Sequence, residues 1–261
     1  MSISLGQGIL LSLMAFIVSW DKRWESFFIF RPIMVCTFTG IILNDVQLGL
    51  KTGAIAELSC LGLLTVGGTV PPDPLMTGLM TTVIAYQSNS SAETALGLSL
   101  PFALLMQWFL IAQQSLASVV NTKIEEALAK QDIKKFVRLV FTPDLFMTVG
   151  YAIITFFSAY VMQDAITAFV NSFPEFITHG FDIAGGLLPA VGLGLLLKTM
   201  VKAENVPFLV FGFVAMILLQ PDNVLPIALV AAGVAILVYW NDVKMEKLEN
   251  SKMEVNDNDG I

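Results

Sequence analysis

The chain has 261 residues, of which 56% are hydrophobic and 13% are charged, and its formal net charge is -7 at pH 7. Soluble globular domains carry about 25% charged residues, so this composition excludes an ordinary soluble domain. It predicts an all-α polytopic membrane protein in a lipid bilayer. No basic patch interleaved with aromatic residues is present, so we expect no nucleic-acid partner.

Apolar segments of about the 20 residues that a spanning helix needs follow one another along the chain. We expect the first to be a retained span, because no basic stretch precedes it and no small-residue cleavage site follows. Two further segments between residues 53 and 86 are short or interrupted, and they form either two crossings or a re-entrant hairpin. The sequence therefore predicts about 7–9 transmembrane helices, with clear segments at residues 4–20, 25–43, 95–120, 139–163, 181–201, 206–220 and 224–241.

The basic residues predict an orientation. With the N-terminus outside, all of the 14 Lys and Arg residues except Arg31 and Lys51 fall on the cytoplasmic side, as the positive-inside rule requires. Residues 1–241 then form the membrane-embedded domain. Residues 242–261 form a charged tail that we expect to be cytoplasmic and disordered beyond its first turns.

Glu57 lies inside an otherwise apolar stretch. An acid at bilayer depth costs about 2.5–3.5 kcal/mol, so such residues usually face a cavity or a partner. The glycines and prolines that follow, at Gly67-Gly68 and Pro71-Pro72, interrupt a helix, and irregular backbone at that depth lines an enclosed cavity. Two interpretations stay open: Glu57 accepts hydroxyl groups of a solute such as a sugar, or it pairs with Arg31 and supports the fold.

Asp73 stands between Pro72 and Pro74. It is placed to bind a solute, to cap a helix that begins near Pro74, or to do both. Gln107 lies inside the 95–120 segment, where its amide could hydrogen-bond a solute or a neighbouring helix.

Arg31-Pro32 lies in the middle of the 25–43 segment, where a buried guanidinium needs an acidic partner. Glu57, Asp45 and Asp73 are the candidates, and a structural pair is favoured over substrate contact. Asn44 and Asp45 end the segment, either as a helix-terminal turn or as gate residues.

The sequence offers no catalytic residue and no metal site. There is no P-loop, no HExxH pair and no GxSxG motif, and His179 is the single histidine. Cys36 and Cys60 form no CxxC pattern, so we expect buried, reduced thiols.

Taken together, these residues resemble one family: the membrane subunit IIC of the mannose-type (mannose–fructose–sorbose) branch of the bacterial PEP-dependent sugar phosphotransferase system. The resemblance covers roughly residues 1–240. The residues that carry it are Arg31-Pro32, Gly40, Asn44-Asp45, Gly49, Gly53, Glu57, Gly62, Gly67, Pro72-Asp73 and the stretch from Pro174-Glu175 to Gly185-Gly186.

The resemblance implies a protein of the bacterial cytoplasmic (inner) membrane that pairs with a second membrane subunit, IID, in a homo-oligomer of the IIC–IID unit. IIA and IIB subunits carry the phosphoryl group, and IIB phosphorylates the sugar. IIC itself carries no phosphorylated residue, so no cofactor is expected on this subunit, with PEP as the phosphoryl donor to the system.

The resemblance places the sugar-contacting region at Glu57, at the Leu64–Gly67 turn with Thr65 and Gly67, and at Asp73. Mannose members tend to carry Asn where this chain has Thr65, and Pro71-Pro72-Asp73 is closer to members that take amino sugars such as N-acetylgalactosamine. We therefore expect a subunit that passes a hexose or amino sugar inward. The alternatives are a proton-coupled secondary sugar transporter, with Glu57 as proton relay, and a non-transporting membrane scaffold.

Overall fold

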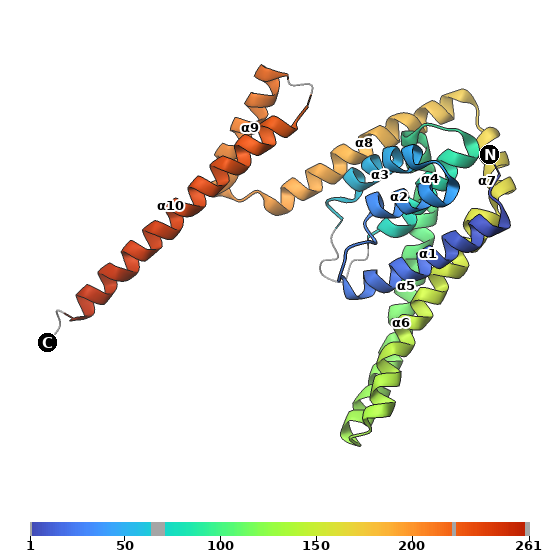
Figure 1. Cartoon of the computed structure of the whole chain (residues 1–261), viewed down its shortest axis with the longest axis horizontal. Coiled ribbons are helices and arrows are strands. Elements are labelled where there is room, and N and C mark those ends of the chain that lie inside the picture. Colours follow the sequence, from blue (N-terminus) through green and yellow to red (C-terminus); the bar gives the residue numbers. More distant parts are fainter. Residues whose placement is uncertain (1, 64–70, 221–222, 259–261) are drawn as a thin grey trace. The chain divides into compact units, whose positions relative to one another are not determined.

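The computed structural model describes residues 2–63, 71–220 and 223–258 (Figure 1). All the secondary-structure elements assigned within these residues are helices, as predicted. The chain divides into two compact units, Met1–Thr199 and Met200–Ile261. Four helices of the described residues are long and apolar enough to cross a membrane: Ala92–Ala129, Ile133–Val161, His179–Met200 and Leu225–Met245. Pro32–Leu43 and Ala203–Leu219 are shorter apolar helices. The chain is thus a multi-pass membrane protein.

The core of the first unit is built around α4 (Pro74–Ser88), which is buried on nearly all sides. It packs against α2 (Pro32–Leu43), α3 (Val46–Cys60) and α5 (Ala92–Ala129). Leu75, Met76, Leu79, Met80 and Val83 are fully buried there. A helix that is apolar all round is suited to such a central place.

The α2–α3 connection is a tight turn. Asn44 adopts a left-handed conformation with φ 61°, and the Asp45 carboxylate accepts the backbone N–H of Leu48 at 3.0 Å. The two helices approach closely, because a Cβ on Gly40 would lie 2.9 Å from the Cα of Gly49. Asn44 and Asp45 therefore form the helix-terminal turn that the sequence allowed; a gate role for them stays a prediction.

The predicted 25–43 span is wrong in its first part. Helix α1 (Leu5–Trp24) ends before it, and α2 begins only at Pro32, so Arg31 is the N-cap residue of α2 and not a mid-helix residue. Proline has no N–H and is favoured in the first helical turn, while the residue before it avoids the helical region. The intervening loop is held by Asp21, whose carboxylate accepts the N–H groups of Phe27 at 2.7 Å and Ile29 at 2.8 Å.

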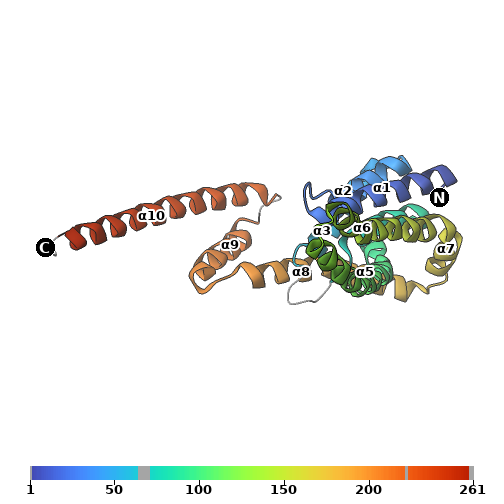
Figure 2. The same cartoon turned by 90° about the horizontal axis from the view of Figure 1, so that it is seen from below.

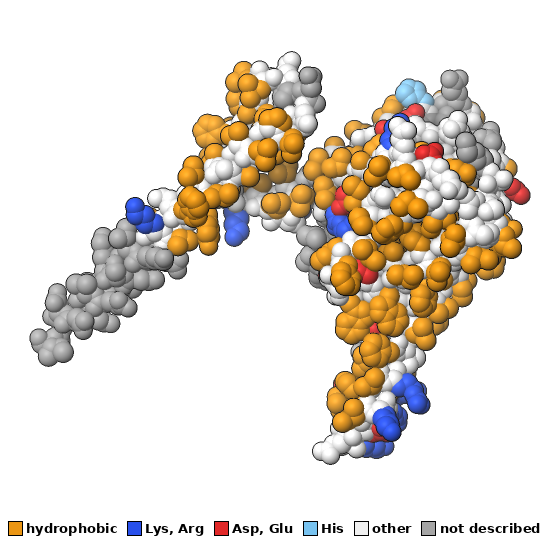
Figure 3. All heavy atoms as spheres, in the orientation of Figure 1, with side chains coloured by type: hydrophobic (Ala, Val, Ile, Leu, Met, Phe, Trp, Pro, Cys, Tyr) orange, Lys and Arg blue, Asp and Glu red, His pale blue; other side chains and the backbone are white. Residues whose placement is uncertain are grey.

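Helices α5 and α6 (Ile133–Phe156) form an antiparallel hairpin whose end extends beyond the neighbouring helices of the first unit (Figure 1). α1 packs along α6 (Figure 2). Lys and Arg side chains gather at the tip of the hairpin (Figure 3). The exposed basic residues of this region are Lys123, Lys130, Lys134, Lys135 and Arg138. After α6 the chain continues through the π-helix η1 (Phe157–Val161) and α7 (Gln163–Asn171).

Helix α8 (Glu175–Met200) packs on α5 and on the end of α3. Its contact residues are spaced alternately by four and three positions, so they lie along one face of the helix. Phe181 lies against Gly97, and Gly185 lies against the backbone of Glu93. Further along, Leu188 packs on Cys36, Ala56 and Leu96. Gly192 and Leu195 then lie at the end of α3, beside the Leu58 carbonyl and Gly62 respectively.

The second unit contains η2 (Ala203–Asn205), α9 (Val206–Leu219) and α10 (Leu225–Asn258). Many of its large apolar side chains are exposed, among them Phe211, Leu218 and Tyr239. α10 continues past Asp242 into the charged tail, where we expected the helix to end within the first turns. Met, Glu, Lys and Leu, which are frequent in that stretch, are good helix formers.

Candidate functional site

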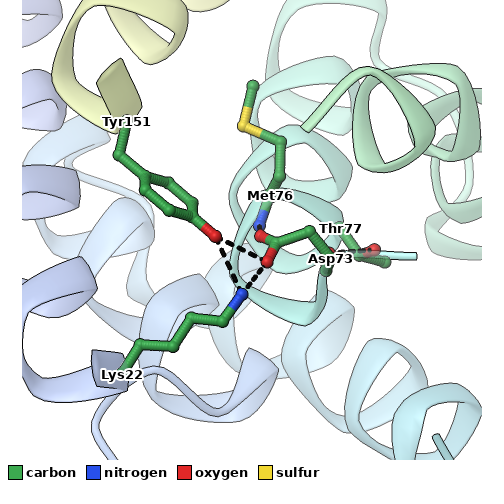
Figure 4. A network of polar contacts seen from close by, with 5 residues as sticks. All are labelled: Lys22, Asp73, Met76, Thr77 and Tyr151. Carbon is green, nitrogen blue, oxygen red and sulfur yellow. Dashed lines mark hydrogen bonds and ion pairs between the residues drawn. The ribbon is translucent and has the colours of Figure 1, made fainter. Parts of the chain in front are cut away.

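Asp73 is the centre of a buried polar cluster that joins three helices (Figure 4). Its Oδ1 accepts the N–H of Met76 at 2.8 Å, which caps α4 as the sequence predicted. Its Oδ2 forms an ion pair with Lys22 of α1 and accepts the hydroxyl of Tyr151 of α6 at 2.7 Å. Lys22 Nζ also donates to the Tyr151 hydroxyl at 2.8 Å. Both carboxylate oxygens of Asp73 are therefore engaged.

Burial makes this cluster energetically important. Asp73 is 1% exposed and Tyr151 is fully buried, whereas the Lys22 side chain is 20% exposed. Removing one partner of a buried ion pair leaves an uncompensated charge and costs about 3–5 kcal/mol. The ammonium group also lies 5.4 Å from the centre of the Tyr151 ring, a favourable cation–π arrangement.

Glu57 and Arg31 form a second charged centre, at the end of α3 and the start of α2. Arg31 Nε donates to Glu57 Oε1 at 2.7 Å, and Nη2 contacts the same oxygen. Glu57 Oε2 accepts the N–H of Ile33 at 3.2 Å. The carboxylate thus also satisfies the free N-terminus of α2, where the helix dipole favours a negative charge. Of the two interpretations of Glu57, the internal pair is present; a sugar contact stays a prediction.

The Glu57–Arg31 pair is partly accessible, with side-chain exposures of 17% and 31%. The acid of this pair is therefore partly exposed, whereas the Asp73 carboxylate is fully buried. The two centres flank the break between α3 and α4, and Cys60, the last residue of α3, lies within electrostatic range of Glu57, Asp73 and Arg31. Predicted site residues Thr65 and Gly67 lie within 64–70, outside the described residues. Gln107 is half-buried on α5.

Arg23 adds a third ion pair. Its Nε donates to Asp144 Oδ1 at 2.7 Å, and Asp144 is buried on α6. Lys22 and Arg23 follow the predicted 4–20 segment but lie in the last turn of α1, and both pair with buried acids. Their charges are compensated within the bundle.

The sequence interpretation missed Lys22, Tyr151 and Asp144 as members of these centres. A signal existed for two of them. A tyrosine and an aspartate inside the apolar 139–163 segment each need a polar partner once they are buried. Their partners, however, lie far away in the sequence: 78 residues separate Tyr151 from Asp73, and 121 separate Arg23 from Asp144.

Among the described residues, no group of three or more His, Cys, Asp and Glu side chains is arranged to hold a metal ion. Hydroxyls contribute further polar contacts in the core. Thr52 of α3 and Thr82 of α4 share a hydrogen bond of 2.8 Å, and the Cys36 thiol donates to the carbonyl of Gly78 at 3.1 Å.

Several known proteins are similar to this chain in sequence. The chain is 45% identical over 239 residues to "N-acetylgalactosamine permease IIC component 1" of Escherichia coli (strain K12), covering 92% of this chain and 90% of that protein. It is 26% identical over 215 residues to the sorbose-specific EIIC component of Lacticaseibacillus casei, covering 82% and 78%. It is 24% identical over 216 residues to the mannose-specific EIIC component of E. coli (strain K12), covering 82% and 81%.

Two solved structures have a similar fold. One, titled "Structure of membrane protein", aligns with a TM-score of 0.83 at 22% identity, covering 92% of this chain and 97% of that chain. A chain from the mannose transporter ManYZ complex with microcin E492 aligns with a TM-score of 0.59 at 23% identity, with the same coverage. The family model described as "PTS system sorbose-specific iic component" matches residues 5–237. The chain therefore belongs to this family, the sugar-specific IIC subunits of the phosphotransferase system.

Proposed function

We propose that this IIC subunit binds N-acetylgalactosamine or a related amino sugar at the break between α3 and α4 and passes it inward for phosphorylation by a IIB partner. The observation that carries the proposal is the partly exposed Glu57–Arg31 pair at this break. The named substrate of the relative at 45% identity supports the choice of sugar.

The chemistry of the pair suits such a ligand. Glu57 accepts hydrogen bonds from adjacent sugar hydroxyls, and the Arg31 guanidinium has five N–H donors for hydroxyl oxygens or an acetamide carbonyl. The pair compensates its own charge while the site is empty. Thr65, Gly67 and Gln107 belong to the proposed site on sequence grounds alone.

The helices around this site are short, which supports a segment that enters the membrane without crossing it. α2 has 12 residues, and α3 and α4 have 15 each. At 1.5 Å per residue these helices reach at most about 22 Å, less than the roughly 30 Å of a hydrocarbon core. We propose that the broken region is re-entrant within a protein of about 7–9 membrane-inserted helices in the bacterial cytoplasmic (inner) membrane, with the N-terminus outside and the C-terminus cytoplasmic.

We propose the IID membrane subunit and the IIA and IIB phosphocarriers as partners, in a homo-oligomer of the IIC–IID unit. The exposed apolar side chains of α9 and α10 suit burial against another membrane helix or lipid. PEP supplies the phosphoryl group to the system, and this subunit binds no cofactor. Phosphorylation traps the sugar inside, because a charged product re-enters an apolar-walled path poorly.

Sugar uptake into vesicles tests the proposal. Membranes that contain this chain and its partner subunits are given labelled hexoses and hexosamines, with and without PEP and the soluble phosphocarriers. We expect PEP-dependent accumulation of N-acetylgalactosamine phosphate. Preferential uptake of mannose would overturn the choice of sugar, and accumulation of free sugar driven by a proton gradient without PEP would indicate secondary transport.

A further inference from the structure

The carboxylate of Asp73 is buried and is engaged by three donors in the described structure. One oxygen accepts the N–H of Met76, and the other is shared between Lys22 and Tyr151 (Figure 4). The side chain is 1% exposed. A sugar hydroxyl would have to enter this buried cluster, where it would compete with the Lys22 ammonium or the Tyr151 hydroxyl for the carboxylate.

The same contacts connect three helices. Lys22 lies in the last turn of α1, Asp73 caps α4, and Tyr151 lies in the C-terminal part of α6. Thr77 donates its hydroxyl to the backbone carbonyl of Asp73 at 2.7 Å, which closes the first turn of α4 from within. The cluster therefore fixes the start of α4, which is one side of the break. Glu57, in the last turn of α3, lies on the other side.

We infer that Lys22 and Tyr151 are positioning residues that hold Asp73 as the anchor of the first turn of α4, and that Asp73 does not contact the sugar. Glu57 is then the acid available for sugar binding. The uptake part of the test below rests on the proposed function; the stability part does not.

Neutralising both members of the Lys22–Asp73 ion pair distinguishes an anchoring role of Asp73 from a sugar-binding role. The variants are Asp73→Asn, Lys22→Met and the double variant. Asparagine retains the oxygen that caps Met76, and its NH2 group can donate to the Tyr151 hydroxyl; methionine retains most of the lysine stem. Each single variant leaves one charge of the ion pair without its counter-charge, whereas the double variant removes both charges. Exposed Asp164→Asn and Lys51→Met are the matched controls.

Thermal unfolding of the purified subunit in detergent is measured first. We expect each single variant to lower the Tm by roughly 5–10 °C and the double variant to recover at least half of that loss. Additive losses in the double variant would overturn the anchor role, because coupled partners deviate from additivity. The Tm comparison tests the anchor role of Asp73 even if the wild-type vesicles take up none of the sugars supplied.

Uptake of labelled N-acetylgalactosamine by the assembled subunits is measured next. We expect Asp73→Asn to lower the maximal rate about tenfold and the double variant to recover to within about threefold of wild type, with KM changed less than about twofold throughout. A stable double variant that still fails to take up the sugar, or whose KM rises about tenfold, would show that Asp73 contacts the sugar.

Tyr151→Phe isolates the positioning role of the hydroxyl. It removes the hydrogen bond that the hydroxyl donates to Asp73 and the one that it accepts from Lys22, and it leaves the aromatic ring in place. We expect the maximal rate to fall about two- to fivefold at unchanged KM, and the exposed Tyr239→Phe to behave as wild type. A Tyr151→Phe variant with wild-type Tm and rate would remove Tyr151 from this role.

Discussion

Glu57 and Arg31 meet across the α2–α3 hairpin, with Arg31 Nε donating to Glu57 Oε1 at 2.7 Å. The carboxylate simultaneously accepts the N–H of Ile33, so it replaces the side-chain cap that Arg31 itself does not provide for α2. A single acid thus neutralises a guanidinium and completes a helix terminus. The pair is partly exposed, and the proposed sugar site is built on it.

We expect Glu57→Gln to reduce sugar uptake while the protein still inserts into the membrane. Glutamine retains an acceptor but loses the charge, and a hydrogen bond to a charged group contributes about 1.5–3 kcal/mol, equivalent to a roughly ten- to hundredfold loss in uptake efficiency. Vesicle uptake and the amount of protein in the membrane fraction are measured together. Glu125→Gln, on the exposed side of α5, is the control. Normal uptake by a stable Glu57→Gln protein would exclude Glu57 from the site.

A substitution at Gly192 should disturb the same region from α8. A Cβ there would lie 2.2 Å from the Leu58 carbonyl oxygen and 2.7 Å from that of Ser59, beside Glu57 in the last turn of α3. We expect Gly192→Ala to destabilise the protein by about 1–3 kcal/mol through overpacking. A Cβ on Gly194 meets nothing within 4 Å, so Gly194→Ala should be neutral or stabilising. Equal Tm values for the two variants would contradict this close packing.

The N-terminal half of α8 is attached to α5 through Asp182. Its Oδ1 accepts the hydroxyls of Thr94 and of Ser91, the N-cap residue of α5. Thr94→Val removes one hydroxyl at constant shape and leaves the cap intact, and because Asp182 is exposed we expect a loss of about 1 kcal/mol. Hydrogen exchange should become faster in the first turns of α8. Thr142→Val, whose hydroxyl bonds within its own helix, should leave this exchange unchanged.

The orientation in the membrane is testable with single cysteines. Cys36 and Cys60 are buried and should not react with an impermeant maleimide, so no cysteine-free background is needed. We expect Lys130→Cys, near the tip of the α5–α6 hairpin, to be labelled only from the cytoplasmic side. Asp164→Cys, at the start of α7, should be labelled only from outside. The reverse pattern would place the N-terminus in the cytoplasm.

Features that depend on neighbouring residues were predictable from the sequence. Composition and segment length determined the all-α membrane class, because burying this many apolar residues in lipid requires helices with internally satisfied backbones. The short polar motifs indicated the Asn44-Asp45 turn and the Asp73 cap, each as one of the roles open to these residues, since capping depends on residues within one helical turn. The glycines and prolines after Glu57 predicted an interruption before Pro74, although α3 already ends at Cys60, ahead of Gly67-Gly68. The resemblance to the IIC family was carried by residues along most of the chain.

The tertiary structure alone decided which charges pair. Arg31 had three possible acidic partners in the sequence, and the packing of α2 against α3 selected Glu57. In the sequence, Lys22 served only as a charge that orients the chain; the packing of α1 beside α4 and α6 brings its ammonium group to Asp73 and Tyr151. Lys22 and Asp73 are 51 positions apart in the sequence, and no local signal predicts their contact. Coulombic and hydrogen-bond partners are selected by distance in three dimensions, and only the packed helices set that distance.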